Sequence, residues 1–351
     1  MADIALVTGG SGFVALEIID QLLAGGGRVH TTVRDLRNEA KVRPLKRLQE
    51  QFPDQLRIFE ANLLSPGSFE SAMQGCTVVF HVAASFLLPE QIKDARQQLI
   101  EPAINGTRNV LETVNRTPSV NRVVMTSTTG AIFGDYIDVR QMKNETPTEE
   151  YFNTSSTAEN YPYHFSKVEA EKEAWRIAKG QARWSFVSIN PGLILGPTLT
   201  SASDSGSLFL LDEMFRGFFF YGLPDWWMAT VDIRDAARAH ITAAQNPSAT
   251  GRYILAQKEM TSLLEMSQIV RKVHKHPWLL PKNQLPDWLV LTFGPIFGLS
   301  RRMMNTHLGI RFKLDNSRSI KELGIIYRPL EETLIDHYYS WLERRKAKPG
   351  V

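Results

Sequence analysis

The chain has almost no cysteine: Cys76 is the single one among 351 residues. A disulfide needs two cysteines, so no disulfide framework can form within the chain, which fits a reducing compartment. The first residues, Met1 to Asp3, place no basic segment ahead of the apolar run at 4–7. We therefore expect no secretory signal and a cytoplasmic protein.

A strong charge of one sign is also lacking. Lysine and arginine number 40 and aspartate and glutamate 37, a net charge of +3. That balance is too small to indicate a nucleic-acid partner. The histidines His81, His164 and His240 are scattered, with no two at ligand spacing on one helix, so we expect no metal site.

Long hydrophobic runs are missing as well. The longest apolar stretch runs from Trp288 to Leu299 and is interrupted by Gly294 and Pro295. It is too short to cross a bilayer, so we expect no membrane span. A lid, a dimer surface and a membrane-facing patch are open alternatives for this stretch, but ordinary core packing is favoured. A homodimer is compatible with the sequence.

What the chain does contain is a regular alternation of short apolar runs and helical patterns. Hydrophobic residues make up 43% and charged residues 22%, as in a packed globular fold. The expected strands cover 4–7, 29–33, 56–59, 76–82, 122–126, 184–189 and 252–255. The expected helices cover 13–23, 40–51, 95–115, 163–178, 231–245 and 330–346. This alternation predicts an α/β fold with a doubly wound parallel sheet covered on both faces.

After Pro191 the pattern loosens. Residues 201–227 read as loop-rich and aromatic, and residues 260–311 show several prolines and tryptophans without strand alternation. We expect a dinucleotide-binding core at 1–190 and a smaller, mostly helical substrate-binding lobe within 191–351. The segment 231–256 is expected to return to the core.

A glycine-rich turn joins the first expected strand to the first expected helix. It reads Gly9-Gly10-Ser11-Gly12-Phe13-Val14-Ala15. Gly9 allows a tight turn, and Gly12 lets a pyrophosphate approach the helix N-terminus, where amide groups favour anions. Ala15 stands where a third glycine is often found. The turn therefore predicts a dinucleotide cofactor.

Arg34 follows the second expected strand, where an acidic residue would bind the ribose hydroxyls of NAD. An arginine there accommodates a 2′-phosphate, and Lys41 can add a second cation. Asp35 is adjacent and leaves NAD open. The pattern predicts NADP as the cofactor.

Tyr163 and Lys167 form a Tyr-x-x-x-Lys pair in a helical stretch. Positions four apart share a helix face, so the ammonium of Lys167 can lie near the phenol of Tyr163. A nearby cation stabilises a phenolate and so makes the phenol a better acid. Alone the pair is a weak signal, but with the glycine turn it predicts a redox enzyme with its own proton donor.

With these motifs in place, the chain resembles the extended short-chain dehydrogenases/reductases, and within them the dihydroflavonol reductase-like carbonyl and aldehyde reductases. The resemblance covers nearly the whole chain and is strongest before about residue 260. It is carried by Thr8 to Ala15, Val33 to Asp35 with Lys41, Ala61 to Leu63, His81 to Ala84, Asn105 to Thr107, Thr126 to Thr128, Tyr163 to Lys167, Asn190 to Gly192, Gly196-Pro197, Val231 to His240 and Leu323-Gly324.

The resemblance implies a Rossmann-type fold and a set of site residues. Thr128 is expected to polarise the substrate carbonyl where the family has a serine, with Ser127 as the fallback; Tyr163 donates the proton and Lys167 assists. Asn62 stands where the family usually has an aspartate that contacts adenine. The expected NADP contacts are Gly9, Ser11, Gly12, Phe13, Val14, Arg34, Lys41, Asn62, Leu63, Val82, Ala83, Ala84, Tyr163, Lys167, Pro191, Gly192 and Leu193.

The substrate pocket is expected to be apolar. Phe133 stands where flavonoid-specific members of the family carry a polar amide, and Ser85 and Phe86 follow the fourth expected strand. Phe219 and Trp227 belong to an aromatic run at 215–227. An apolar or aromatic carbonyl fits such a lining, although the same residues could simply form the core of the second lobe.

These features predict an NADPH-dependent reductase that converts an apolar or aromatic aldehyde or ketone to the alcohol, reversibly. A hydroxysteroid dehydrogenase and a nucleotide-sugar epimerase or dehydratase are alternatives among enzymes. A regulator that senses NADP(H) without turnover is an alternative of another class. Such regulators commonly lack the Tyr-Lys pair, so its presence counts against that reading.

Overall fold

A computed structural model of the chain describes residues 3–84, 92–200 and 205–346. Its centre is a parallel seven-stranded sheet in the order β10-β6-β5-β4-β1-β2-β3. Its strands are β1 (Ile4–Val7), β2 (Arg28–Val33), β3 (Leu56–Glu60), β4 (Val78–His81), β5 (Arg122–Thr126), β6 (Ser185–Pro191) and β10 (Gly251–Leu255). The order reverses between β1 and β4, which creates a crevice at the carboxyl ends of these strands. The predicted doubly wound sheet is confirmed.

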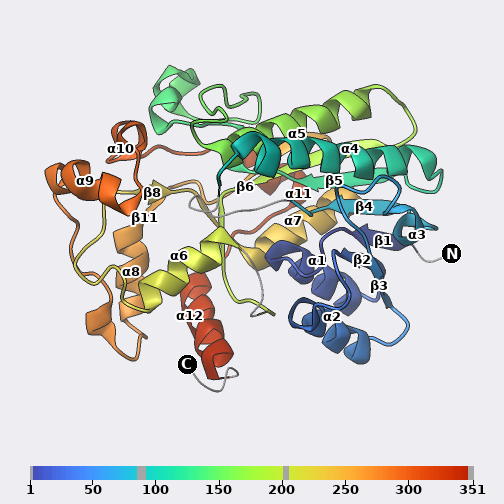
Figure 1. Cartoon of the computed structure of the whole chain (residues 1–351), viewed down its shortest axis with the longest axis horizontal. Helices are drawn as coiled ribbons and strands as arrows, with labels where there is room; N and C mark the ends of the chain where they lie inside the picture. The colour runs from blue at the N-terminus through green and yellow to red at the C-terminus, as the bar shows by residue number, and fades with distance from the viewer. Residues whose placement is uncertain (1–2, 85–91, 201–204, 347–351) are drawn as a thin grey trace.

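Helices cover both faces of this sheet (Figure 1). One face carries α1 (Phe13–Ala24), α2 (Glu39–Gln51), α7 (Ile233–Gln245) and α11 (Ser317–Leu323); the other carries α3 (Glu70–Met73), α4 (Glu101–Arg116) and α5 (Pro162–Lys179). Successive strand residues supply the two cores in turn. Val124 of β5 packs with the first set, whereas Val123 and Met125 pack with the second. This alternation follows from the two-residue period of a strand.

The first turn of the helix expected at 95–115 is not α-helical. A π-helical turn, Arg96–Ile100, precedes α4. After β5 the chain forms short 3-10 turns at Thr129–Ala131, Tyr136–Gln141 and Lys143–Glu145 before it enters α5. These turns carry the residues that follow Thr128 over the carboxyl end of the sheet.

The second lobe contains more regular structure than its sequence pattern predicts. It holds α6 (Gly206–Phe215), α8 (Leu263–Arg271), α9 (Asp287–Phe293), α10 (Arg301–His307) and α12 (Leu330–Lys346), with 3-10 turns at Pro277–Leu279 and Gly294–Phe297. Two small sheets join it, β7 (Leu193–Leu195) with β9 (Thr230–Asp232) and β8 (Trp227–Met228) with β11 (Thr261–Ser262).

The reading of 201–227 as loop-rich was therefore wrong in part, and the stretch at 260–311 contains α8, α9 and α10. Helix α6 packs Leu208, Leu211 and Phe215 inward at helical spacing. Helix α8 starts with a capping box, in which the Ser262 hydroxyl accepts from the amide of Glu265 and the Glu265 carboxylate accepts from the amide of Ser262. Serine followed three residues later by glutamate is a sequence signal for a helix start.

The preference for ordinary core packing at 288–299 was also wrong. Trp288 is 65% exposed and Ile296 is 77% exposed, while Val290 is buried. The helix α9 has seven residues, and Val290 is the one among them that is buried. Leu291 and Phe293 are exposed as well.

The strand β10 lies at one edge of the central sheet, and two side chains close that edge. The guanidinium of Arg318 donates to the carbonyl oxygens of Arg252 at 2.8 Å and Thr250 at 3.0 Å. The Glu149 carboxylate accepts from the amide of Ile254 at 3.0 Å. The outward-facing hydrogen-bonding groups at these positions are therefore satisfied within the chain.

No helix in the described parts of the chain is both long enough and apolar enough to cross a membrane.

Candidate active site

The glycine-rich turn lies at the carboxyl end of β1 and runs against the segment after β4. The Thr8 hydroxyl accepts from the amides of Val82 at 3.1 Å and Ala83 at 3.0 Å. Gly9 has a φ of +71°, and a Cβ on it would lie 3.0 Å from Ala83. A side chain at position 9 would therefore strain the backbone and push these two loops apart.

The start of α1 is suited to an anion. Gly12 caps the helix without any side-chain hydrogen bond, and its first turn contains no acidic residue. The first amide groups of a helix lack intrahelical partners and carry the positive end of the helix dipole. Ser11, Phe13 and Val14 flank this point, so the expected pyrophosphate contacts surround one helix N-terminus.

Arg34 and Asp35 have different surroundings at the end of β2. Arg34 is exposed, and its guanidinium makes no hydrogen bond or ion pair with a described residue. The Asp35 carboxylate accepts from the side chain of Arg37 at 2.9 and 3.2 Å, and these hydrogen bonds lower its pKa. Lys41 lies in the first turn of α2. Asp35, the acidic residue that left NAD as an alternative cofactor, is thus already paired with Arg37.

Asn62 and Leu63 follow β3 in a tight turn. The Asn62 side-chain oxygen accepts from the amide of Leu64 at 3.0 Å, so it stabilises the turn. Leu63 packs against Gly106 of α4, where a Cβ would approach it to 3.0 Å. Asn62, which stands where the family usually has an aspartate, therefore holds this loop in place.

The catalytic candidates Tyr163 and Lys167 lie in the first part of α5. Tyr161, which caps the helix, adopts a left-handed conformation with φ of 58°. This conformation strains the backbone of a non-glycine residue, so surrounding contacts must stabilise it. The Tyr161 hydroxyl is hydrogen-bonded to Nδ1 of His307 at 3.1 Å, and its ring stacks on His164. Helix α10 of the second lobe thus fixes the start of the helix that carries Tyr163.

Lys167 is buried, and its ammonium donates to the carbonyl oxygen of Thr126 at 2.7 Å. Burial lowers the pKa of Lys167 to about 8, while the charge of Glu171 opposes that decrease. Burial also raises the pKa of the Tyr163 phenol above its usual value near 10, so the phenol holds its proton at neutral pH. This direction differs from the lowering that a neighbouring ammonium would cause.

His240 and Thr126 complete the surroundings of Lys167. The Thr126 hydroxyl is bonded to Nε2 of His240 at 2.7 Å, and Nδ1 of that ring is bonded to the Ala236 carbonyl. A carbonyl can only accept, so Nδ1 carries the ring proton and Nε2 accepts. Burial, with a smaller effect of the Lys167 charge, lowers the pKa of His240 to about 4, so the ring is neutral.

Ser127 and Thr128 are adjacent but have different partners. The Ser127 hydroxyl is buried and donates to the Glu171 carboxylate at 2.5 Å. The Thr128 hydroxyl is partly buried and accepts from the amide of Gly130 at 3.1 Å. Among described residues it has no acceptor for its own proton, so Thr128 keeps a donor for a ligand whereas Ser127 does not.

Glu171 and Arg252 form a buried ion pair beneath these residues. Their side chains are 0% and 6% exposed, and Nε of Arg252 lies 2.6 Å from a Glu171 oxygen. The Glu171 carboxylate also accepts from Ser127, from the Asn190 amide at 3.0 Å and from Trp175 at 3.3 Å. This set of contacts, which we call the Glu171 hub, joins β5, β6, β10 and α5.

Arg252 extends the Glu171 hub into the segment before α5. Its guanidinium donates to the carbonyl oxygens of Ala131, Glu149 and Tyr151. The Asn190 side chain donates both to Glu171 and to the Thr128 carbonyl at 3.1 Å. Glu171 therefore fixes the backbone of Thr128 through one intermediate side chain.

Pro191, Gly192 and Leu193 lie at the carboxyl end of β6. Leu193 donates its amide to the Ala229 carbonyl at 2.7 Å. A Cβ on Gly192 would lie 2.4 Å from that carbonyl oxygen, so only glycine allows the close approach. These residues lie at the carboxyl ends of the strands, where Thr128 and the glycine turn also lie.

The predicted substrate residues separate into groups. Phe133 is buried and packs against Tyr136 and Phe312, and Trp227 packs against the same cluster. Phe219 packs instead with the core of the second lobe formed by α6, α8 and α12. Ser85 and Phe86 lie outside the described residues. Phe133 and Trp227 are thus near neighbours, whereas Phe219 belongs to another cluster.

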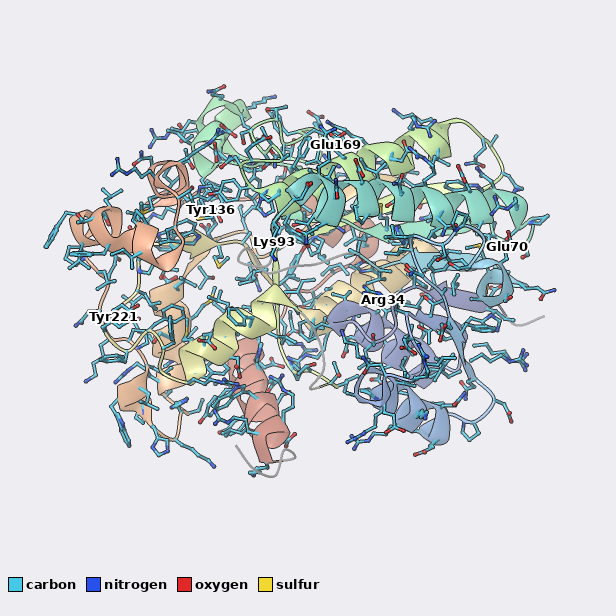
Figure 2. All side chains as sticks on the ribbon, viewed as in Figure 1. Arg34, Glu70, Lys93, Tyr136, Glu169 and Tyr221 are labelled. Atoms are coloured by element: carbon cyan, nitrogen blue, oxygen red, sulfur yellow. The ribbon has the colours of Figure 1, made fainter. Side chains whose placement is uncertain are left out.

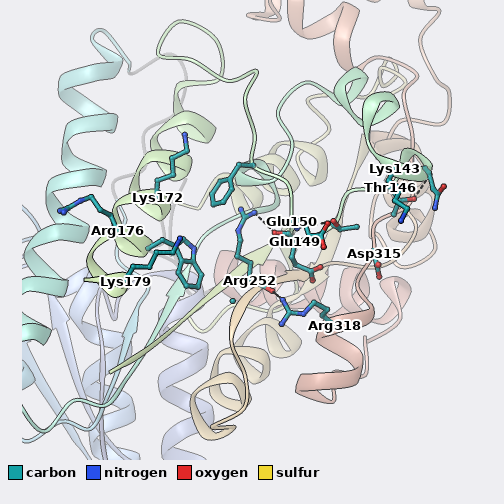
Figure 3. Close-up of a pocket in the computed structure, with 15 residues that line it drawn as sticks. Lys143, Thr146, Glu149, Glu150, Lys172, Arg176, Lys179, Arg252, Asp315 and Arg318 are labelled. Carbon is teal, nitrogen blue, oxygen red and sulfur yellow. Dashed lines mark hydrogen bonds between the residues drawn. The ribbon is translucent and has the colours of Figure 1, made fainter. Parts of the chain in front are cut away.

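A large groove of about 1240 Å³ lies beside the later turns of α5 (Figure 3). It is lined by Phe152, Trp175, the exposed cations of α5 and residues of the 143–150 segment, and Arg252 forms part of its wall. Tyr163 and Lys167 are not among its lining residues. Among the described residues, no group of three or more His, Cys, Asp or Glu could hold a metal ion.

Sequence reasoning missed several residues that position this site. Glu171 lies four residues after Lys167, so the helical repeat places both on one face of α5. The repeat does not reveal which residue of another element pairs with Glu171. Arg252 and His307 approach from segments 81 and 146 residues away from Glu171 and Tyr161, respectively. No local pattern marks such long-range contacts.

Known proteins are similar to this chain over most of their length. The model of the NAD dependent epimerase/dehydratase family matches residues 5–256. A cinnamoyl-CoA reductase of Medicago truncatula is 31% identical over 351 residues, with 99% of this chain and 98% of the relative covered. An anthocyanidin reductase of Arabidopsis thaliana is 38% identical over 259 residues, or 71% of this chain and 74% of the relative.

Among solved structures, Gre2 of Candida albicans in complex with NADPH is similar to this chain. It superposes with a TM-score of 0.77 at 26% identity, covering 97% of this chain and 99% of that chain. The chain belongs to the NAD dependent epimerase/dehydratase family. The resemblance to the dihydroflavonol reductase-like branch is confirmed, and so is the expectation of an oxidoreductase.

The Glu171 hub leads to a prediction about stability. Glu171→Gln keeps the size of the side chain but removes the charge that balances buried Arg252. Breaking a buried ion pair from one side costs about 3–5 kcal/mol. We expect thermal unfolding, followed by circular dichroism, to shift down by several degrees or more.

Glu169→Gln is the matched control on the same helix. Glu169 pairs with Lys172 at 2.9 Å on the exposed side of α5, and such surface pairs contribute about 1 kcal/mol or less. Equal melting temperatures for the two variants would show that the Glu171 hub does not stabilise the fold.

Proposed function

We propose that this protein is an NADPH-dependent reductase of apolar or aryl-bearing aldehydes and ketones, acting reversibly. The observation that carries the proposal is the hydrogen bond from the Lys167 ammonium to the Thr126 carbonyl, which holds the helix of Tyr163 beside the end of β5, just before Thr128. The named reductases among the relatives, and the NADPH bound by the Candida albicans protein, support it.

The cofactor fits the residues present. The uncapped start of α1 suits a pyrophosphate, and the exposed Arg34 suits a 2′-phosphate at the end of β2. Asp35 is held by Arg37 and so opposes that phosphate less than a bare carboxylate would. NADPH, when bound, supplies the hydride for the carbonyl carbon.

The side chains of the chain handle the oxygen and its proton. As hydride reaches the carbonyl carbon, the oxygen gains negative charge, and two hydroxyl donors stabilise it. Thr128 donates a hydrogen bond to this oxygen. Tyr163, which is protonated at neutral pH, transfers its phenolic proton to it and completes the alcohol. In the reverse direction the phenolate of Tyr163 takes the proton back.

Lys167 acts through position and charge. Lys167 lies one helical turn after Tyr163 on α5. Its ammonium is held by a hydrogen bond to the Thr126 carbonyl. A cation there stabilises the phenolate left after proton transfer. Its pKa of about 8 leaves mostly the ammonium form at neutral pH. Thr128 takes the carbonyl role in this proposal because Ser127 is occupied by Glu171.

Tyr163→Phe tests the proton donor. The change removes the phenolic proton and leaves the ring, so we expect kcat to fall by on the order of 10²–10⁴-fold. NADPH binding, measured by fluorescence titration, should change little. Tyr339→Phe, at a tyrosine that is 50% exposed on α12, is the control. A Tyr163→Phe enzyme with more than about a third of wild-type kcat would contradict the assignment.

Arg34→Ala tests the cofactor preference. A charge-assisted contact with phosphate contributes roughly 1.5–3 kcal/mol, so the wild type should favour NADPH over NADH at least about tenfold in kcat/KM. The variant should lose this preference, mainly through the KM for NADPH. Arg43→Ala removes another exposed cation of the same region and should keep it. Equal kcat/KM for both cofactors in the wild type would rule out the role of Arg34.

A homologous series of alkyl aryl ketones tests the substrate class. Each buried methylene contributes about 0.8 kcal/mol, so kcat/KM should rise about fourfold per carbon until the pocket is full. The measurement follows NADPH absorbance, with nucleotide sugars and short polar carbonyls as controls. No trend across the series, or a preference for a nucleotide sugar, would overturn the apolar pocket and leave the catalytic pair intact.

A further inference from the structure

The end of the second lobe carries an unusual concentration of exposed apolar side chains. Trp278 and Trp288 are 68% and 65% exposed, and Ile296 is 77% exposed. We call this surface the apolar tip. Its members are Phe218, Phe220, Tyr221, Trp278, Trp288, Leu291, Phe293 and Ile296. Exposed apolar surface concentrated in one region marks an interaction site more often than chance.

The segments of the apolar tip are joined to one another. The amide of Leu223 donates to the Asn283 carbonyl at 3.2 Å, and the amide of Leu285 donates to the Leu223 carbonyl at 2.8 Å. The turn at 217–222 therefore lies beside the segment that leads into α9. Figure 1 places α9 at the end of the molecule remote from β3, and Figure 2 places Tyr221 at that same end.

Cations accompany the apolar tip. Lys275, Lys282 and Arg301 make no ion pair with a described residue, and Arg302 pairs with Asp135. The only carboxylate in the sequence between positions 275 and 302 is Asp287. Beside the 218–221 part of the tip, the Asp225 carboxylate accepts from the Trp227 indole. The stretch 275–302, which holds the part of the tip at 278–296, therefore combines tryptophan, phenylalanine and isoleucine with more cations than carboxylates.

This combination selects one kind of occupant. In a symmetric dimer the same patch meets itself, so the uncompensated cations of two copies would be brought together. Lysine is also depleted in protein interfaces. Aromatic side chains with flanking lysine and arginine instead favour the headgroup region of a bilayer, where anionic lipids attract the cations.

We propose that the apolar tip is a docking surface for an anionic lipid bilayer, on which the protein lies peripherally. Trp288, Leu291, Phe293 and Ile296 enter the headgroup region, and Lys282 and Arg301 contact lipid phosphates or carboxylates. The proposal does not depend on the identity of the substrate or on the catalytic pair.

Sedimentation with vesicles tests it. The wild-type protein should bind vesicles of phosphatidylcholine with 30% phosphatidylserine at least about tenfold more strongly than vesicles of phosphatidylcholine alone, since each basic residue near the surface contributes. The double variant Trp288→Ser/Ile296→Ser should weaken binding to the anionic vesicles at least about tenfold. Lys282→Glu/Arg301→Glu should abolish the preference for anionic vesicles.

Ile326→Ser is the matched control, because Ile326 is 88% exposed but lies between α11 and α12. It should bind vesicles like the wild type, and thermal unfolding should confirm that all variants are folded. Wild-type protein that fails to bind anionic vesicles, or equal binding by Trp288→Ser/Ile296→Ser, would overturn the proposal. So would a dimer, seen by light scattering, that this double variant dissociates while vesicle binding stays absent.

Discussion

The carboxylate of Glu171 is the group on which the rest of the site depends. It is buried without access to water, so its charge must be balanced by Arg252 and by hydrogen-bond donors. Those donors come from Ser127 just after β5, from Asn190 near the end of β6 and from Trp175 in α5. Satisfying one buried charge therefore fixes the relative positions of three elements that carry Thr128, Pro191 and Tyr163.

The same constraint divides the work between neighbouring residues. The Ser127 hydroxyl donates a hydrogen bond to Glu171, whereas the Thr128 hydroxyl only accepts one from Gly130, and for this reason the proposed mechanism assigns the carbonyl to Thr128. Lys167, one turn before Glu171, remains a cation in a buried setting because that carboxylate offsets part of the burial cost. In the proposed mechanism, residues that hold the structure thus alternate with residues that act on the substrate, both just after β5 and along α5.

Much of the fold could be predicted from the sequence, because its strongest signals are local. Short apolar strands, the glycine turn and the Tyr163–Lys167 spacing each depend on residues within one element. Helix α6 and the exposed face of α9 were missed, since hydrophobicity alone does not say which side of an apolar segment is covered. Arg252 and His307 were missed for a different reason, as their partners lie far away in the sequence. The roles of Phe133, Phe219 and Trp227 in substrate binding stay predictions.

The closure of the sheet edge at β10 limits how copies of this chain can associate. Arg318 and Glu149 occupy hydrogen-bonding groups that a further strand would need. Strand addition at this edge would require breaking charge-assisted contacts before any new ladder could form. An oligomer that continued the sheet through β10 is therefore disfavoured, and assembly of this chain would have to use helical or loop surfaces instead.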